Sequence, residues 1–244
     1  MSASQFVGTS TSRVTVFVDP SLGASAVQNA DDLLADADRV VAKNNEIFGA
    51  DAGPANVMIF ALDGRTDGTG GADHSSCDFT SGNNIEVDAS FGNSARVSAL
   101  FEAEFSECMM NGNLCGLSTG EALSRWCAAV VSNNALSDFA TAPIWVADGM
   151  PNWVDSTAQT DRDDDGNGCG VAFISWLLST GQTLEQVARG IVALGDSGTL
   201  AQLYGNLTGG NPNDAWPNFR AAVQALGPGG VKGDDPFGSV FPAR

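Results

Sequence analysis

Positive charge is scarce in this chain of 244 residues, which has 11 lysines and arginines against 29 aspartates and glutamates. The formal net charge of −18 leaves no basic stripe to neutralise phosphates, so we expect no nucleic-acid partner. Anionic membrane surfaces are disfavoured for the same reason. No apolar run approaches the roughly 20 residues that a membrane-spanning helix needs, so no membrane association is expected either. The composition is typical of a soluble acidic protein that attracts cations.

The N-terminus also lacks the basic segment and apolar segment of a signal peptide. We therefore expect a cytoplasmic protein or the mature form of a secreted one. The five cysteines form no C-x-x-C pair, which disfavours zinc ribbons and thioredoxin-type sites. Without a leader, reduced and buried thiols are expected. Cys108 and Cys115 are close enough in sequence to close a small loop if they are oxidised.

Histidine is almost absent, since His74 is the only one in the chain. A metal site made of histidines alone is therefore excluded within one chain. His74 lies in the glycine-rich stretch 63–83, which predicts a long loop, and loops of this length are usually functional or disordered. If this loop folds over the helix that follows, His74 would join Glu104, Glu107 and Asp148 in a metal site. The alternative is an exposed histidine that binds nothing.

Periodicity predicts strands and helices in the first half of the chain and helices alone in the second. The expected strands are 13–18, 56–62 and 84–90, the last at a sheet edge; the expected helices are 24–48, 94–110, 118–132, 169–180, 183–194, 199–207 and 214–226. This order predicts an α+β fold, with a small N-terminal mixed sheet and long helices followed by a mainly helical C-terminal half. We expect one domain over 1–227, with an α/β half at 13–110 and a helical half at 111–227, and an extended tail at 228–244.

The second long helix has a carboxylate within its apolar stripe. At about 100° per residue, Glu104 projects between Leu100 and Phe101, Glu107 lies at the border of that face, and Glu102 points away. We therefore expect Glu104 to be buried and Glu102 to be exposed. A carboxylate in such a stripe is costly unless it is paired, protonated or bound to a metal. Both a structural glutamate bonded to its neighbours and a carboxylate of a functional site remain open.

This order of elements resembles the catalytic core of gluzincin metallopeptidases, the thermolysin-like clan. In that family a helix carries HExxH, whose histidines hold zinc and whose glutamate is the general base, and a later W-[LV]-x-E-G segment adds a ligand. The segment Ala103-Glu-Phe-Ser-Glu107 matches the place of HExxH. The resemblance implies Glu104 as base and Glu107 as ligand, whereas Ala103 cannot bind a metal. Trp145-Val-Ala-Asp-Gly149 matches the later segment and puts Asp148 in the place of the third ligand.

Because the two histidines of HExxH are missing, we do not expect zinc catalysis. One hypothesis is a non-catalytic metallopeptidase-like protein that acts by binding a protein partner or by self-assembly. The alternative is a metal-dependent hydrolase or peptidase with a carboxylate-rich site and Glu104 as general base. Oxygen ligands suit manganese, magnesium or calcium better than zinc, so zinc is not the expected ion.

An acidic stretch later in the chain resembles a calcium loop. Its D-x-D-x-D-G opening is matched by Asp161, Asp163, Asp165 and Gly166, and Asn167 follows. Such carboxylates converge on an ion because the loop winds around it. The twelfth position is Ala172, so the bidentate glutamate is missing and we expect weak calcium binding. The alternative is a solvated acidic turn before a helix N-terminus, which favours negative charge.

Overall fold

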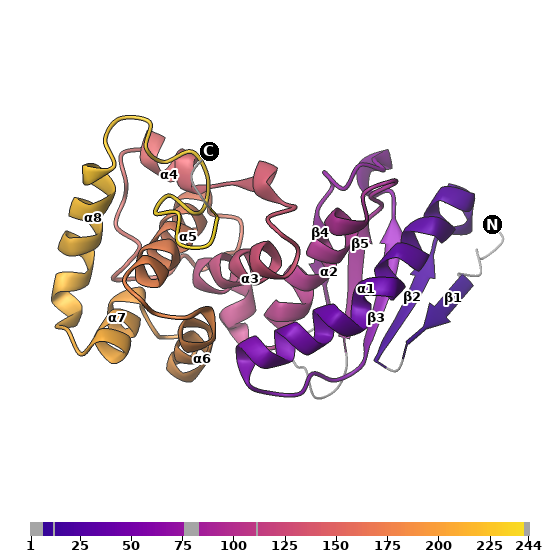
Figure 1. Ribbon diagram of the computed structural model, residues 1–244, viewed down its shortest axis with the longest axis horizontal. Helices are drawn as coiled ribbons and strands as arrows, with labels where there is room; N and C mark the ends of the chain where they lie inside the picture. The colour runs from indigo at the N-terminus through magenta and orange to yellow at the C-terminus, as the bar shows by residue number, and fades with distance from the viewer. Residues whose placement is uncertain (1–6, 12, 76–82, 111, 242–244) are drawn as a thin grey trace. The chain divides into compact units, whose positions relative to one another are not determined.

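The computed structural model describes residues 7–11, 13–75, 83–110 and 112–241. Within these residues the predicted α+β class is confirmed, since the strands come first and the later half is mainly helical (Figure 1). The chain divides into two compact units. The first consists of Met1–Glu46, Ala50–Asn111 and Cys127–Leu136, and the second of Ile47–Gly49, Gly112–Trp126 and Ser137–Arg244. The expectation of one domain over 1–227 stays a prediction.

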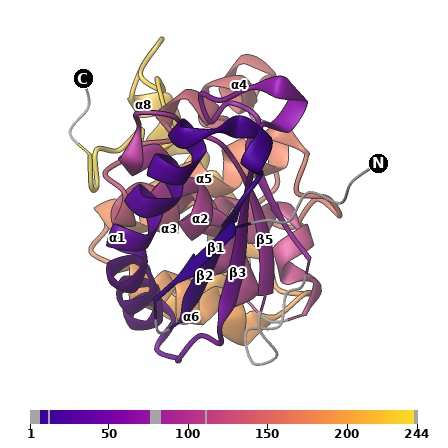
Figure 2. The ribbon, with the colours of Figure 1, turned by 90° about the vertical axis from the view of Figure 1, so that its right-hand side faces the viewer.

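The first unit contains a five-stranded sheet with the order β1-β2-β3-β5-β4. The strands are β1 (Val7–Ser10), β2 (Val14–Val18), β3 (Ala55–Phe60), β4 (Ala72–His74) and β5 (Asn83–Asp88). The central strands β2, β3 and β5 are parallel, whereas β1 and β4 pair antiparallel at the two edges (Figure 2). A strand does form near the predicted range 84–90, as β5. The prediction that it lies at a sheet edge is wrong, because β4 pairs along its outer side. A three-residue strand inside a glycine-rich stretch is too short to leave a pattern.

Two long helices follow in the first unit, α1 (Ala24–Phe48, whose last two residues belong to the second unit) and α2 (Ser94–Cys108). One face of the sheet is fully buried through alternate residues of its three central strands, which are Val14, Val16, Val57, Ile59, Ile85 and Val87. This period of two is what a half-buried strand requires. Helix α2 packs on β4 and β5. It begins after Asn93, the N-cap, whose side chain accepts a hydrogen bond from the backbone N–H of Arg96 at 3.1 Å.

The second unit is built from helices. They are α3 (Ser118–Val131, whose last residues belong to the first unit), α4 (Ala142–Ala147), α5 (Asp164–Ser179), α6 (Leu184–Leu194), α7 (Leu200–Thr208) and α8 (Ala215–Ala225). Its core contains Trp145, which is fully buried and stacks on Phe219 with ring centroids 5.5 Å apart. Among the described residues, no helix is both long enough and apolar enough to cross a membrane.

Helices α4 and α5 approach each other closely because α5 carries a glycine at the contact. A Cβ atom on Gly168 would lie 2.5 Å from the carbonyl oxygen of Thr141 and 2.7 Å from the Cβ of Trp145. Both obstacles are stiff, since one is backbone and the other is the root of a buried ring. Helix α4 itself was not predicted from the sequence, and α5 begins at Asp164 rather than at residue 169.

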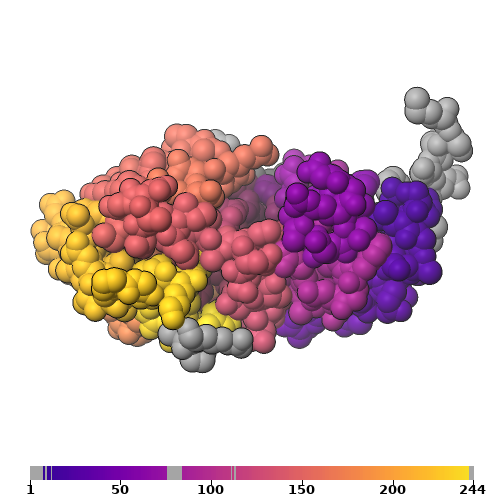
Figure 3. All heavy atoms as spheres, turned by 90° about the horizontal axis from the view of Figure 1, so that it is seen from above, coloured from indigo at the N-terminus to yellow at the C-terminus, as the bar shows by residue number. Residues whose placement is uncertain are grey.

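The C-terminal segment 228–241 forms no helix or strand, and two aspartates attach it to the helices of the second unit. Asp234 accepts hydrogen bonds from the backbone N–H groups of Thr141 and Ala142, both at 2.9 Å. Asp235 accepts one from the hydroxyl of Ser175 at 2.5 Å. Figure 3 shows this segment in yellow against the red atoms around α4. The tail therefore follows a defined path along the second unit.

Candidate functional site

Helix α2 is buried on more than one face, which changes the roles of its glutamates. Every residue from Arg96 to Glu102 is buried. Glu102 is 0% exposed, so the prediction that it faces solvent is wrong. The prediction assumed a helix with one buried face, whereas α2 lies on the sheet and also next to α1. Arg39 of α1 is near enough to act on Glu102 electrostatically.

The buried carboxyl of Glu102 has no hydrogen-bond partner for either of its oxygens among the described residues. Burial raises its pKa well above the usual value, and the positive charge of Arg39 opposes this shift only in part. Glu102 is thus an uncompensated polar group in the core, and its neutral form is favoured.

The structure brings together three of the residues that the sequence proposed as a site: His74, Glu104 and Glu107. The Nε2 atom of His74 lies 3.1 Å from Oε2 of Glu107 and 3.9 Å from Oε2 of Glu104. Their side chains are 12%, 4% and 14% exposed for His74, Glu107 and Glu104, so Glu104 is largely but not fully buried. We call these three residues the His–Glu cluster.

Local structure explains how a histidine from a predicted loop reaches the helix. His74 ends β4, where it is the partner of Ile85 in the antiparallel ladder with β5. Helix α2 packs on β4, and Glu104 and Glu107 are three positions apart, so they share one side of the helix. The position of His74 is therefore set by sheet pairing rather than by a flexible loop.

The two carboxylates of the cluster make their surroundings strongly negative. Burial raises the pKa of the Cys108 thiol, and the charges of Glu104 and Glu107 raise it further. Cys108 is buried and forms no disulfide, and its raised pKa favours the protonated thiol. A thiolate ligand from Cys108 is therefore disfavoured, and the His–Glu cluster offers one imidazole nitrogen and carboxylate oxygens.

The spacing of these donor atoms is close to, but does not match, that of ligands on a shared metal ion. Ligand atoms bound tetrahedrally at about 2.0–2.2 Å lie roughly 3.3–3.6 Å from one another. The separations of 3.1 Å and 3.9 Å from His74 Nε2 fall on either side of that range. The same 3.1 Å separation from Glu107 also fits a hydrogen bond in which a protonated His74 donates. The cluster can thus hold an ion or form an ion pair without one.

Asp148, the third predicted metal ligand, belongs to the second unit, where it follows the last residue of α4 and is exposed. It lies close enough to Asp165 to affect that residue. Burial raises the pKa of Asp165, and the charges of Asp148, Asp163 and Asp164 add to this shift. The role of Asp148 as a ligand beside His74 stays a prediction.

The prediction that 161–169 forms a loop is wrong, because α5 begins at Asp164 within this segment. Asp163 is the N-cap and accepts a hydrogen bond from the backbone N–H of Gly166 at 2.6 Å. Asn167 donates through Nδ2 to the carbonyl oxygen of Asp161 at 2.6 Å. The strong cap competes with a loop wound around an ion, and Asp165 lies in the first helical turn. Calcium binding by Asp161, Asp163, Asp165 and Asn167 stays a prediction.

The cysteines only partly follow expectation. Cys108, Cys127 and Cys169 are buried and form no disulfide, as predicted for reduced thiols. Cys115 is disulfide-bonded, so the expectation of a reduced thiol is wrong for this residue, and no small loop joins it to Cys108. Cys77 lies outside the described residues.

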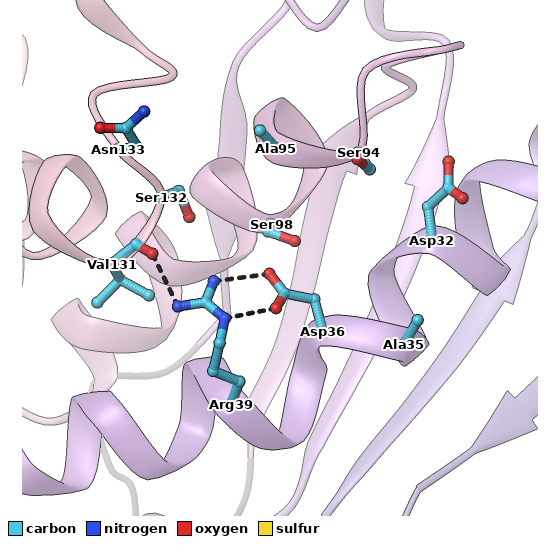
Figure 4. A pocket seen from close by; sticks show the side chains of 10 residues that line it. All are labelled: Asp32, Ala35, Asp36, Arg39, Ser94, Ala95, Ser98, Val131, Ser132 and Asn133. Atoms are coloured by element: carbon cyan, nitrogen blue, oxygen red, sulfur yellow. Dashed lines mark hydrogen bonds and ion pairs between the residues drawn. The ribbon is translucent and has the colours of Figure 1, made fainter.

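A second feature of the first unit left no motif in the sequence. A groove with a volume of about 520 Å³ lies between α1 and α2 (Figure 4). We call it the α1–α2 groove; it is lined by Asp32, Ala35, Asp36, Arg39, Ser94, Ala95, Ser98, Val131, Ser132 and Asn133. Three separate segments contribute these residues, so no spacing within one segment could have indicated the groove.

Comparison with known proteins identifies no family for this chain. No protein-family description matches this chain, and no curated protein sequence matches it. Its candidate sites are therefore interpreted from their own geometry and chemistry.

Proposed function

We propose that the protein is a metal-dependent hydrolase that binds a divalent metal ion at the His–Glu cluster. One observation carries the proposal: His74 Nε2 lies within 3.1 Å and 3.9 Å of carboxylate oxygens on Glu107 and Glu104, in a largely buried setting. The gluzincin resemblance supports it, because Glu104 stands in the place of that family's general base and Glu107 in the place of a ligand.

In this proposal each residue of the cluster has a separate task. His74 and Glu107 would hold the ion, and the nearly complete burial of Glu107 strengthens its electrostatic interactions. When bound, the ion would polarise a water molecule and lower its pKa. Glu104 is the most exposed of the three side chains, and in this proposal its carboxylate would act as the general base that accepts a proton from water and returns it to a leaving group.

The donor set limits the ions that suit the site. In this assignment His74 gives the ion an imidazole and Glu107 a carboxylate, with the Glu104 carboxylate close by. Such a set is compatible with manganese, iron or zinc, whereas alanine at position 103 removes a ligand that zinc peptidases of the gluzincin type use. Manganese is therefore our first choice, and the carboxylate-rich composition favours it over zinc.

The test separates metal binding from catalysis. The unaltered chain and its Glu104→Gln and Glu107→Gln variants are titrated with Mn²⁺ and Zn²⁺ by calorimetry, and hydrolysis is assayed with a peptide library and simple esters. We expect Glu104→Gln to bind the ion and to lose hydrolysis, and Glu107→Gln to lose both. Glu86→Gln, on the exposed side of β5, is the matched control. Metal binding that is unchanged in Glu107→Gln would overturn the proposal.

The second candidate function is a non-catalytic protein that acts by binding a protein partner or by self-assembly. The observation that favours it is the length of the contact between His74 and Glu107, which also fits an ion pair. A protonated His74 would then neutralise one of the two carboxylates, and no ion would be needed. The same titrations distinguish the two candidates, because this second candidate predicts no saturable binding of Mn²⁺ or Zn²⁺.

A further inference from the structure

Helix α7 ends on a short sequence that can be chemically modified, Asn206-Leu207-Thr208 (Figure 1). The pattern Asn-x-Ser/Thr, in which x is any residue except proline, is the acceptor sequence for N-linked glycosylation. No other asparagine of the chain is followed two positions later by serine or threonine. The sequence therefore offers a single acceptor of this kind, and it lies in the second unit, away from the residues of the His–Glu cluster.

The two residues that define the acceptor are both on the surface. Asn206 and Thr208 are exposed, so an oligosaccharide on Nδ2 of Asn206 would extend into solvent and displace no packed side chain. The opposite side of the helix faces the core through three buried residues, which are Leu200, Ala201 and Leu203. The fold therefore tolerates a large group at this position.

The hydroxyl of Thr208 is engaged once the helix has formed. It donates to the carbonyl oxygen of Tyr204 at 2.7 Å and accepts a hydrogen bond from the backbone N–H of Gly210 at 3.1 Å. A modifying enzyme that reads this hydroxyl must therefore act before α7 is complete. Such access is available during synthesis, because α7 has only nine residues and an isolated helix shorter than about 12–15 residues is marginal in water.

The surroundings of the acceptor are neutral in a chain of formal charge −18. Between Asp196 and Asp214 no residue carries a charge, so this segment lacks the ionic groups that keep the rest of the surface solvated. A glycan is bulky and solubilising, and at Asn206 it would supply solvation where charge does not.

The disulfide state gives an independent indication of the compartment. Cys115 is disulfide-bonded, and disulfides form and persist mainly in oxidising compartments, such as the secretory pathway. The sequence alone left open a cytoplasmic protein and the mature form of a secreted one. The disulfide favours the secreted form, and the secretory pathway is also where Asn-x-Ser/Thr sequences are glycosylated.

We infer that Asn206 is a site of N-linked glycosylation, and that its co-substrate is an oligosaccharide carried on a polyprenyl phosphate or diphosphate. In this transfer Nδ2 of Asn206 forms a bond to the anomeric carbon of the first sugar and gives up one proton. The bond from that carbon to the phosphate oxygen breaks, and the lipid phosphate leaves with the electron pair. No oxidant or reductant is consumed. The site is independent of the proposed hydrolase function, because it uses no residue of the His–Glu cluster.

The experiment expresses the full chain behind a secretion signal in a eukaryotic host and measures its intact mass before and after treatment with peptide N-glycosidase F. We expect the mass of one oligosaccharide, which the enzyme removes while converting Asn206 to aspartate. Asn206→Gln and Thr208→Ala should carry no oligosaccharide. Thr208→Ser should still carry one, because serine keeps the hydroxyl of the acceptor sequence.

Asn218→Gln is the matched control, since Asn218 is exposed on α8 and is followed two positions later by arginine. This variant should carry the same oligosaccharide as the unaltered chain. Import into microsomes during translation in vitro gives the same readout for any variant that is not secreted. An unmodified Asn206 in the imported or secreted chain, or an equal added mass on Asn206→Gln, would overturn the inference.

Discussion

The Nε2 atom of His74 lies 3.1 Å from Oε2 of Glu107, although 33 positions separate the two residues in the chain. The pairing of β4 with β5 and the packing of α2 on β4 create this proximity. The chain's one histidine is therefore held against the most buried carboxylate of the cluster by regular structure. The proposed metal site rests on this contact, which regular secondary structure holds in place, unlike a chance contact between surface side chains.

Glu102→Gln should stabilise the protein at alkaline pH. Burial raises the pKa of Glu102 in the folded state, so folding takes up a proton once the pH exceeds the usual value of 4.5. The native carboxyl therefore has little effect below that pH and destabilises the fold increasingly as the pH rises. We expect a gain on the order of 1–3 kcal/mol at pH 8 and little change at pH 4. Urea unfolding across this pH range measures it.

The exposed Glu86→Gln on β5 serves as the control for that series, since it removes the same charge from the surface. If the difference in the free energy of unfolding between Glu102→Gln and the unaltered protein stays constant from pH 4 to pH 8, the carboxyl does not titrate in the core.

Gly168→Ala should destabilise the second unit, despite the higher helix propensity of alanine. The added Cβ would meet the carbonyl oxygen of Thr141 at 2.5 Å, and backbone can move little in a packed core. We expect a loss of about 1–3 kcal/mol in the free energy of unfolding. Gly116→Ala is the control, because a Cβ there meets nothing within 4 Å. Equal melting temperatures for the two variants would refute the close contact between α4 and α5.

The regular elements were largely predictable, whereas the surroundings of the glutamates were not. Helix α1 was predicted over its full length, because its apolar residues repeat regularly and a glycine follows it. Strand β4 could not be recognised, since only pairing with β5 makes three residues of a glycine-rich stretch into a strand. Glu102 was misplaced because a helical projection identifies one apolar face and cannot indicate that a second helix covers the other. The start of α5 was missed because Asp163 fits a calcium loop and an N-cap equally well.

Asp163→Ala should destabilise α5 by about 1 kcal/mol, and Asp163→Asn should have little effect. The reason is the hydrogen bond that the Asp163 side chain accepts from the backbone N–H of Gly166, which asparagine can also accept. Thermal melting in a buffer with a calcium chelator measures both variants. Equal losses for alanine and asparagine would show that the charge, rather than the cap, matters at this position.

Calcium binding at 161–167 predicts a separate effect. Millimolar calcium should then raise the melting temperature of the unaltered protein by mass action and leave that of Asp163→Asn unchanged. If calcium changes the melting temperature of the two proteins equally, or of neither, the segment is an acidic start of a helix that does not bind calcium.

Asp235→Asn should loosen the C-terminal segment. Burial alone would raise the pKa of Asp235, but hydrogen bonds from the Ser175 hydroxyl and from the backbone of Phe241 and Val240 outweigh it and lower the pKa. Its contribution to stability is therefore present above its usual pKa of 3.8 and is lost as the pH falls below that value. We expect a loss of about 1–2 kcal/mol at pH 7 and faster amide exchange at 239–241. The exposed Asp214→Asn is the control, and equal exchange in both variants would contradict this role.

The measurement that tests the central claim most directly is the metal content of the chain purified without chelator and then equilibrated with Mn²⁺. It is determined by elemental analysis after gel filtration, for the unaltered protein and for the variants His74→Gln, Glu107→Gln and Asp161→Asn. We predict close to one ion per chain for the unaltered protein and for Asp161→Asn, which lies in the other unit, and a loss of at least tenfold in occupancy for the two cluster variants. No retained ion in the unaltered protein, or equal retention in all four, would contradict a metal site at His74 and Glu107.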